Sequence, residues 1–160
     1  MKVILNPGEK DPYHGVPSLI RSIEKRLEGL NIEHLTLTSN SEMTDRVRMI
    51  NRMSRNEDYI LLTIESGTGP WSVNVAYNSD GRSRALAQIL AVSAEKRVLV
   101  NVPRVENDGQ KYWKKTIPVC SNTACPSVLI MGQPTENLED IRETVIEGLC
   151  NYLGIQYDII

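Results

Sequence analysis

The spacing of apolar residues along the chain predicts strands that alternate with helices. The longest apolar run covers residues 59–64, with Asp58 before it and Glu65 and the glycine-rich segment 67–70 after it. A short, nearly unbroken apolar run is typical of a strand buried on both faces of a helix-covered parallel sheet. We expect this strand to be central. It delivers Glu65 to the sheet edge where open α/β folds bind ligands.

Other apolar runs predict further strands at residues 3–5, 32–37, 71–77, 97–102 and 127–131. The run 71–77 alternates apolar residues with small or polar ones, which indicates a half-buried strand. The run 127–131 is continuous and predicts a second buried strand, entered from Pro126.

Helical spacing of apolar residues predicts four helices between these strands. The first begins near Pro17 and ends at Gly29, as helix-initiating proline and helix-terminating glycine favour. Ser39 and Glu42 have the spacing of a capping box, and Asn137 is a candidate N-cap of the last helix. The apolar stripes of the second, third and last helices are Met43, Val47, Ile50 and Met53; Leu86, Ile89 and Leu90; and Ile141, Val145, Leu149 and Leu153.

This order of elements predicts an α/β three-layer sandwich in which helices flank a mostly parallel sheet of about six strands. The chain of 160 residues shows no repeat, low-complexity tract or linker, so we expect residues 1–160 to form a single domain.

Composition excludes several classes of function. The net charge of −2 supplies no field for nucleic acid, so we expect no nucleic-acid partner. No apolar run approaches the roughly 20 residues of a membrane span, and the amino terminus lacks the pattern of a signal peptide. Three cysteines, Cys120, Cys125 and Cys150, form neither a disulfide framework nor a zinc motif, which favours reduced thiols. Cys120 would be nucleophilic only beside a base.

Four polar residues follow the predicted strands and form a candidate site. Glu9 comes directly after the turn Asn6-Pro7-Gly8, Asp11 and His14 lie just beyond it, and Glu65 ends the central strand. Acids clustered at one sheet edge repel one another, which raises the pKa of at least one of them or recruits a cation. The simpler interpretation of Glu9 and Glu65 is that they are solvated loop acids.

The segment 111–115, Lys-Tyr-Trp-Lys-Lys, interleaves aromatic residues with lysines inside a polar loop at residues 106–115. Such side chains stack on a base or a sugar. The alternative is a solvated loop with one anchoring tryptophan.

Four motifs resemble the zinc-dependent N-acetylmuramoyl-L-alanine amidases, which cleave the bond between the glycan and the stem peptide of peptidoglycan. The motifs are Asn6-Pro7-Gly8; Asp45-Arg46-Val47 with Asn51 and residues 58–64; Asn122-Thr123 with residues 126–130; and residues 137–140. The resemblance covers nearly the whole chain and implies the amidase fold. It also places Arg46 where it would hold its helix against the central strand.

The resemblance implies a zinc site that this sequence does not reproduce. The family binds zinc with a His after the first Pro-Gly, a Glu at the start of the first helix and a His after the central strand, and its catalytic Glu ends the last strand. Here Glu9 and Glu65 stand at the two His positions, and Met131 stands at the catalytic position. No Glu aligns with the second ligand, near which lie Asp11 and His14. A methionine cannot accept a proton, and we expect the second histidine, His34, to be structural.

Three hypotheses remain. In the first, the chain is a non-catalytic amidase-like domain, or pseudo-enzyme, without a cofactor, which binds peptidoglycan fragments or a protein partner. In the second, it is a hydrolase with a rebuilt site, in which Glu9, His14 and Glu65 hold zinc, manganese or magnesium, with carboxylates favouring the latter two. In the third, it is an unrelated α/β binding module. We expect a cytoplasmic protein, or a phage-encoded one released without a signal peptide.

Overall fold

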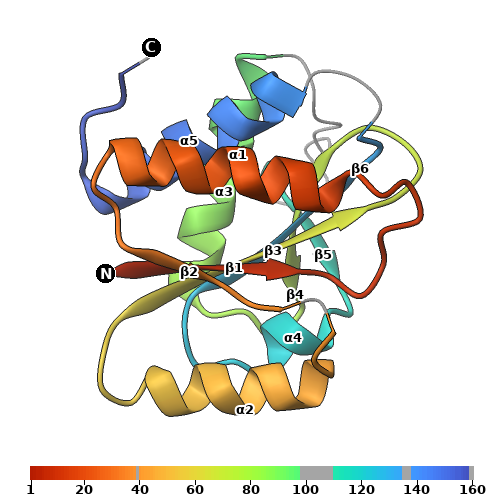
Figure 1. Ribbon diagram of the computed structural model, residues 1–160, viewed down its shortest axis with the longest axis vertical. Coiled ribbons are helices and arrows are strands. Elements are labelled where there is room, and N and C mark those ends of the chain that lie inside the picture. Colours follow the sequence, from red (N-terminus) through yellow and green to blue (C-terminus); the bar gives the residue numbers. More distant parts are fainter. Residues whose placement is uncertain (39, 98–109, 135–137, 159–160) are drawn as a thin grey trace.

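The structure is a computed structural model that describes residues 1–38, 40–97, 110–134 and 138–158, and these form three layers (Figure 1). The middle layer is one six-stranded sheet in the order β2-β1-β3-β6-β4-β5. Its strands are β1 (Lys2–Pro7), β2 (His34–Thr36), β3 (Tyr59–Ser66), β4 (Ser72–Ala76), β5 (Trp113–Lys115) and β6 (Ser127–Gly132). Neighbouring strands in this sheet are parallel except for β4 and β6. The predicted α/β sandwich with a mostly parallel sheet is therefore confirmed.

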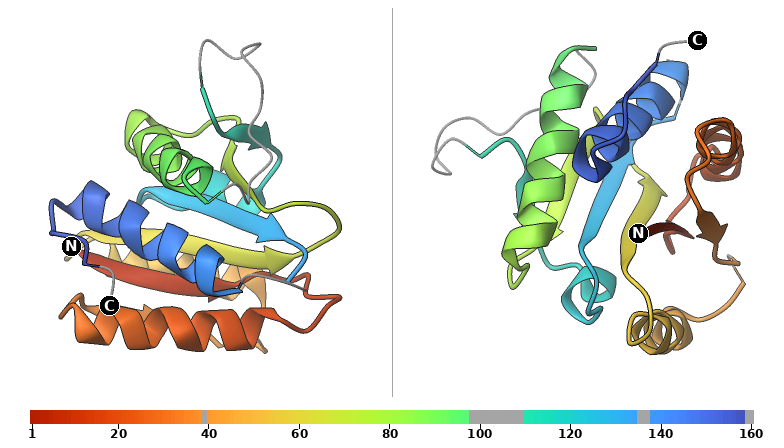
Figure 2. Two further views of the ribbon diagram at one scale, coloured as in Figure 1. Left: turned by 90° about the horizontal axis from the view of Figure 1, so that it is seen from above. Right: turned by 90° about the vertical axis from the view of Figure 1, so that its left-hand side faces the viewer.

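Helices cover both faces of the sheet, as Figures 1 and 2 show. The helices on one face are α1 (Val16–Gly29), α3 (Gly81–Glu95) and α5 (Leu138–Leu153), and those on the other are α2 (Met43–Met53) and the short α4 (Pro118–Ser121). Each face has its own apolar cluster, the larger one under α1, α3 and α5. The smaller one packs Ile4, Leu61 and Leu129 of the sheet against Ile50 of α2 and Val119 of α4.

The central strand has the predicted burial but extends further than its apolar run. Residues 59–64 are all buried, and β3 continues through Glu65 to Ser66. The prediction of a half-buried strand at residues 71–77 is wrong, because all of β4 is buried. This strand is an interior strand between β6 and β5, and its two faces are covered by α3 and α4, which lie on opposite sides of the sheet. Tyr77, just past its end, is 70% exposed. Its small and polar residues are interior residues that the alternation pattern assigns to solvent.

The helix boundaries agree with the predicted stripes but not with every predicted cap. Pro17 lies in the first turn of α1, and the unpredicted cap Asp80 accepts a hydrogen bond from the Ser83 N–H at 2.9 Å. The capping box is wrong, because α2 begins at Met43 with Glu42 as its N-cap residue and without a side-chain cap. Ser39, Asn137 and the predicted strand residues 98–102 lie outside the described residues.

The polar loop predicted at 106–115 contains a short edge strand, since residues 113–115 pair with β4 as β5. Its anchor is Tyr112, which is 2% exposed, whereas Trp113 is 36% exposed. The prediction of an anchoring tryptophan is therefore wrong. Within the part of the chain that the structure describes, no helix combines the length and the apolar character needed to cross a membrane.

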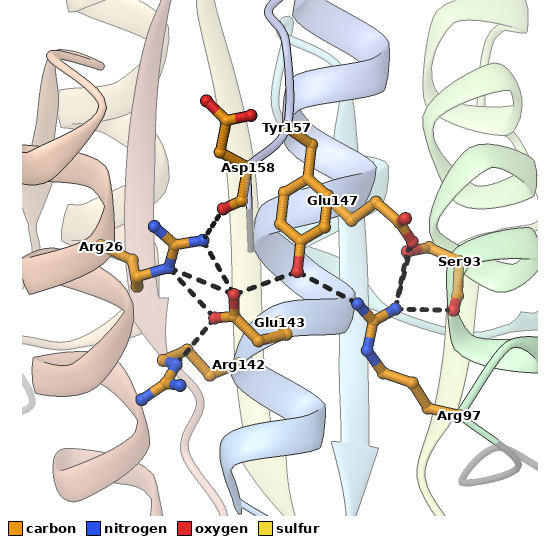
Figure 3. A network of polar contacts seen from close by, with 8 residues as sticks. All are labelled: Arg26, Ser93, Arg97, Arg142, Glu143, Glu147, Tyr157 and Asp158. Carbon is orange, nitrogen blue, oxygen red and sulfur yellow. Dashed lines mark hydrogen bonds and ion pairs between the residues drawn. The ribbon is translucent and has the colours of Figure 1, made fainter. Parts of the chain in front are cut away.

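The carboxyl-terminal segment is tied to α1, α3 and α5 by a polar network (Figure 3). Glu143 of α5 accepts hydrogen bonds from Arg26 of α1 at 2.8 Å and from the Tyr157 hydroxyl at 3.0 Å. Arg97 donates to Tyr157 at 3.2 Å and to Glu147 at 3.1 Å. These bonds join three helices and the tail (Figure 3), within the helical layer opposite α2 and α4 (Figure 1). We therefore attribute to them a stabilising role.

Candidate functional site

A pocket of about 760 Å³ opens at the carboxyl ends of β3 and β6, on the side of the sheet that α2 and α4 cover. Its charged lining residues are Glu9, Lys10, Arg48, Glu65 and Lys115, and its apolar ones include Met43, Val47, Ile117, Val119, Leu129 and Met131. The volume falls within the range of roughly 300–1,000 Å³ that is usual for small-molecule sites. An apolar wall with a few charged groups suits an amphipathic ligand.

Glu65 and Met131 form the sheet edge of this pocket. They are register partners on the neighbouring strands β3 and β6, so their side chains emerge side by side. Both are half-buried, and Met131 packs against the smaller apolar cluster. The Lys115 ammonium group contacts Met131 Sδ at 3.6 Å. The resemblance placed a zinc ligand and a catalytic acid at these two positions, and the structure brings the two residues together there.

Gly8 allows the first loop to approach Glu65 closely. A Cβ atom at residue 8 would lie 1.9 Å from Glu65 Cγ, a distance that no side chain can adopt. The Gly8 N–H donates to the Ile64 carbonyl at 2.8 Å, which fixes the loop beside the end of β3. The glycine in the turn after β1 therefore allows the backbone of this turn to contact the Glu65 side chain.

Burial raises the pKa of the Glu65 carboxyl above its ordinary value. Lys10 and Lys115 lower the pKa and so oppose this effect, as does a backbone hydrogen bond from Glu9, while the Glu9 charge adds to it. The nearby cations offset only part of the effect of burial on this carboxyl. It therefore favours its neutral form more than the carboxyl of an exposed glutamate does. This group can therefore donate or accept a hydrogen bond, depending on pH.

The other predicted site residues separate in space. Asp11 accepts a hydrogen bond from Ser66 Oγ at 2.6 Å, and the same hydroxyl accepts the Tyr13 N–H at 3.3 Å. Asp11 lines a neighbouring pocket of about 570 Å³ between the starts of α1 and α2, which Glu9 also borders. His14 is exposed with a φ of 56° and is not among the described residues that line either pocket. Glu9 and Glu65 therefore share a pocket, while Asp11 anchors the loop.

The remaining histidine has the expected structural place. His34 lies half-buried in the edge strand β2, and its Nδ1 lies 3.0 Å from the Ile32 carbonyl oxygen. Among the residues that the structure describes, no three His, Cys, Asp or Glu side chains are grouped so that they could hold a metal ion. Since Asp11 is also engaged by Ser66, the described donor set does not fit a zinc centre.

Arg46 lines the neighbouring pocket and is buried, with an exposed fraction of 2%. Its guanidinium donates to Asn6 Oδ1 at 2.8 Å, to the Pro7 carbonyl and to the Ser41 carbonyl at 3.1 Å. Burial lowers its pKa. The expectation that Arg46 holds α2 against the central strand needs correction, because its direct partner is β1. Asn6 then reaches β3 by donating to Thr63 Oγ1 at 3.0 Å.

The cysteines offer no second reactive centre. All three thiols are free and buried, and burial raises the pKa of Cys120 to about 11. A thiol with such a pKa stays protonated at neutral pH and is a poor nucleophile.

Sequence patterns missed one wall of the pocket. Val119 lies in α4 and Ile117 is its N-cap residue. This helix has four residues, too few for a helical repeat of apolar residues to be recognised in the sequence. Lys115 was expected in a loop, and only its position on β5, beside Met131, places it at the pocket. Pro118 is the one local signal for this wall, since proline favours a first helical turn.

No protein-family model matches the sequence, and no curated protein matches it. Solved structures do match. The N-acetylmuramyl-L-alanine amidase Ami1 from Mycobacterium smegmatis has a TM-score of 0.75 at 14% identity, with 98% of each chain covered. The catalytic domain of the amidase CwlV from Bacillus (Paenibacillus) polymyxa var. colistinus has a TM-score of 0.69 at 14% identity, over 98% of this chain and 100% of that one.

The CwlD amidase from Clostridioides difficile, solved in complex with the GerS lipoprotein, has a TM-score of 0.69 at 13% identity, over 98% of this chain and 100% of that one. Identities this low establish the fold and no more. The chain therefore has the fold of the N-acetylmuramoyl-L-alanine amidases, and its six-stranded sheet and flanking helices agree with it.

Proposed function

We propose that the chain is a non-catalytic domain of the amidase fold that binds peptidoglycan fragments in the pocket beside Glu65. One observation carries this proposal: the adjacent positions at the ends of β3 and β6 hold a carboxyl with a raised pKa and a methionine. A thioether neither takes up a proton at neutral pH nor is a usual ligand of zinc. A pocket of about 760 Å³ lies beside these two positions.

The chemistry of the pocket supports a muropeptide as the ligand. A muropeptide combines carboxylates and amides with aliphatic side chains. Lys10 and Lys115 at the rim supply cations for the carboxylates, while Met43, Val47 and Leu129 supply apolar surface for the aliphatic groups. A small number of placed polar groups within an apolar lining is the usual composition of a ligand site.

Calorimetric titration with a defined muropeptide tests this function. We expect saturable binding, which Val47→Asp weakens at least tenfold because it puts a charge on the apolar wall. Val92→Asp is the matched control, since Val92 is 40% exposed on α3, in the opposite helical layer. Absence of binding would refute the proposal, and so would metal-dependent cleavage of the muropeptide during the titration.

One observation favours a second candidate, a hydrolase that uses carboxyl chemistry. The raised pKa of Glu65, in a pocket that Glu9 also lines, is the kind of property that supports general acid catalysis by a carboxyl. This candidate requires muropeptide turnover that falls as pH rises through the pKa of Glu65 and that Glu65→Gln abolishes. Product analysis without added metal decides between the two functions.

A further inference from the structure

A second hollow, the Trp113 side pocket, lies next to the main one. It has a volume of about 300 Å³ and is lined by Thr68, Pro70, Ser72, Trp113, Lys115 and Met131. Trp113 belongs to the edge strand β5 and is 36% exposed, although it pairs with Asn74 of β4 through its backbone. A partly exposed indole at the edge of a hollow presents a flat apolar surface to a ligand.

The Trp113 side pocket and the main pocket adjoin each other. Lys115 and Met131 line both of them, so these two residues form the boundary between the two hollows. The described residues offer the Lys115 ammonium group the sulfur of Met131, at 3.6 Å, as a hydrogen-bond acceptor. A thioether is a weak acceptor. Lys115 therefore retains donors for a ligand group that spans the two pockets.

We propose that the Trp113 side pocket binds one pyranose ring of the ligand whose peptide occupies the main pocket. This inference rests on the proposed function and assigns the sugar to one hollow and the peptide to the other. The apolar C–H face of a pyranose stacks on the indole of Trp113, as flat apolar groups do on aromatic rings. The hydroxyl of Thr68 and the ammonium of Lys115 line the same hollow and supply polar groups for the edge of the ring.

The size of the hollow and its charge favour a sugar over the stem peptide. At about 300 Å³ it is less than half as large as the main pocket of about 760 Å³, which suits one ring rather than a chain of several residues. Lys115 is its charged lining residue, whereas the main pocket also has Glu9, Lys10, Arg48 and Glu65. The charged ends of a peptide therefore find more partners in the main pocket.

Tryptophan fluorescence tests the assignment, since the chain has two tryptophans and Trp71 is only 4% exposed. N-acetylmuramic acid and the free stem peptide are titrated separately. We expect the sugar to change the emission of Trp113 saturably, and Trp113→Ala to weaken sugar binding, measured by calorimetry, about tenfold. The same substitution leaves the affinity for the stem peptide unchanged. Unaltered Trp71 emission checks that the variant folds.

A lysine pair supplies the matched control. Lys115→Ala weakens the binding of both ligands, because Lys115 lines both hollows, whereas Lys114→Ala weakens neither, since Lys114 is not among the described lining residues. If stem peptide binds but sugar binding is absent or survives Trp113→Ala, the sugar assignment is overturned and the proposed function stands. If neither ligand binds, both are overturned. A nucleotide that binds Trp113 as tightly as the sugar would also overturn the assignment.

Discussion

Glutamates in two regions of the molecule have opposite electrostatic environments. On α5, burial alone would raise the pKa of Glu143 and Glu147, but hydrogen bonds from arginines, a lysine, a serine and a tyrosine outweigh it, so that both pKa values are lowered. At the end of β3, burial raises the pKa of Glu65, and the lysines nearby compensate only in part. The same residue type is therefore stabilised in its charged form in one region and not in the other.

The difference separates stabilising charges from charges that remain open to a ligand. Every carboxylate oxygen of Glu143 and Glu147 accepts a described hydrogen bond within the network of Figure 3 and its Lys96 extension. Glu65 instead borders a pocket of about 760 Å³. The carboxylates of Glu143 and Glu147 are fully hydrogen-bonded, whereas the carboxyl of Glu65 is compensated only in part. A titratable group with a perturbed pKa beside a pocket is typical of a functional site.

Removing a charge from the network gives the largest effect on stability. Glu143→Gln weakens the contacts with Arg26, Arg142 and Tyr157, whose partner carboxylate is 15% exposed. We expect the free energy of unfolding to fall by about 2–3 kcal/mol, between the values typical of exposed and of fully buried pairs. Denaturant unfolding followed by circular dichroism measures it.

Two variants control this prediction. Glu139→Gln alters an exposed glutamate in the first turn of the same helix and should cost less than about 1 kcal/mol. Glu65→Gln should also cost less than about 1 kcal/mol, because burial already favours the neutral carboxyl. Equal losses for Glu143→Gln and Glu65→Gln would remove the distinction between the two regions.

A smaller effect is expected at the loop anchor beside the site. Ser66→Ala removes the hydroxyl that bonds Asp11 at 2.6 Å and the Tyr13 N–H at 3.3 Å. We expect a loss of about 1–2 kcal/mol in the free energy of unfolding. A double-mutant cycle with Asp11→Ala should give a coupling energy above about 0.5 kcal/mol. Simple additivity would show that Asp11 is available to a ligand rather than committed to the loop.

The pH dependence of stability separates the two regions by sign. Glu143 and Glu147 have lowered pKa values, so their contribution is complete above the ordinary value of 4.5 and is lost as pH falls through their folded pKa values. Glu65 has a raised pKa, so its contribution is complete below 4.5 and is lost as pH rises through its folded pKa.

Urea unfolding from about pH 3 to about pH 7 measures both signs. Glu143→Gln should flatten the acid limb of the stability profile, whereas Glu65→Gln should flatten a decline above pH 4.5. If Glu65→Gln instead flattened the acid limb, the carboxyl of Glu65 would be a stabilising charge like those on α5.

The smallest effect concerns the neighbour of Glu65. Met131→Glu places a second carboxyl at the register position beside it, and two adjacent carboxylates cannot both ionise readily. We expect the pKa of Glu65 to rise further, as ¹³C NMR titration of its carboxyl would show. Met49→Glu, on the exposed face of α2, is the control that should leave the Glu65 titration unchanged. An unchanged Glu65 in Met131→Glu would mean that the two side chains diverge.

The fold was predictable wherever burial follows the local pattern. The run that became β3 is buried as its pattern indicates, and so are Ile141, Val145 and Leu149 of the stripe of α5. The pattern failed for β4, whose polar residues Ser72 and Asn74 are buried within the sheet, with Asn74 donating to the Leu129 carbonyl at 3.2 Å. Alternation cannot distinguish such interior polar residues from exposed ones.

Only the part of the site that lies at the ends of strands was predictable from the sequence. Glu65 and Met131 meet because parallel strands end at the same sheet edge. The partnership of Asp11 with Ser66, and of Arg46 with Asn6, depends on loop paths that no periodicity encodes. The segment 111–115 was ambiguous for the same reason. The sequence does not show which of its two aromatic residues is buried, and in the structure this is Tyr112 and not Trp113.

An NMR titration with an intact muropeptide tests whether the pocket binds this ligand without cleaving it, because one sample reports on the protein and on the ligand. We expect saturable shifts of the amides of Glu9, Val47, Glu65 and Lys115, which line the pocket. We also expect the ligand's own glycan–peptide amide signal to persist unchanged in area, with or without added Zn²⁺ or Mn²⁺. Loss of that amide signal, with release of free stem peptide, would show that the domain is catalytic.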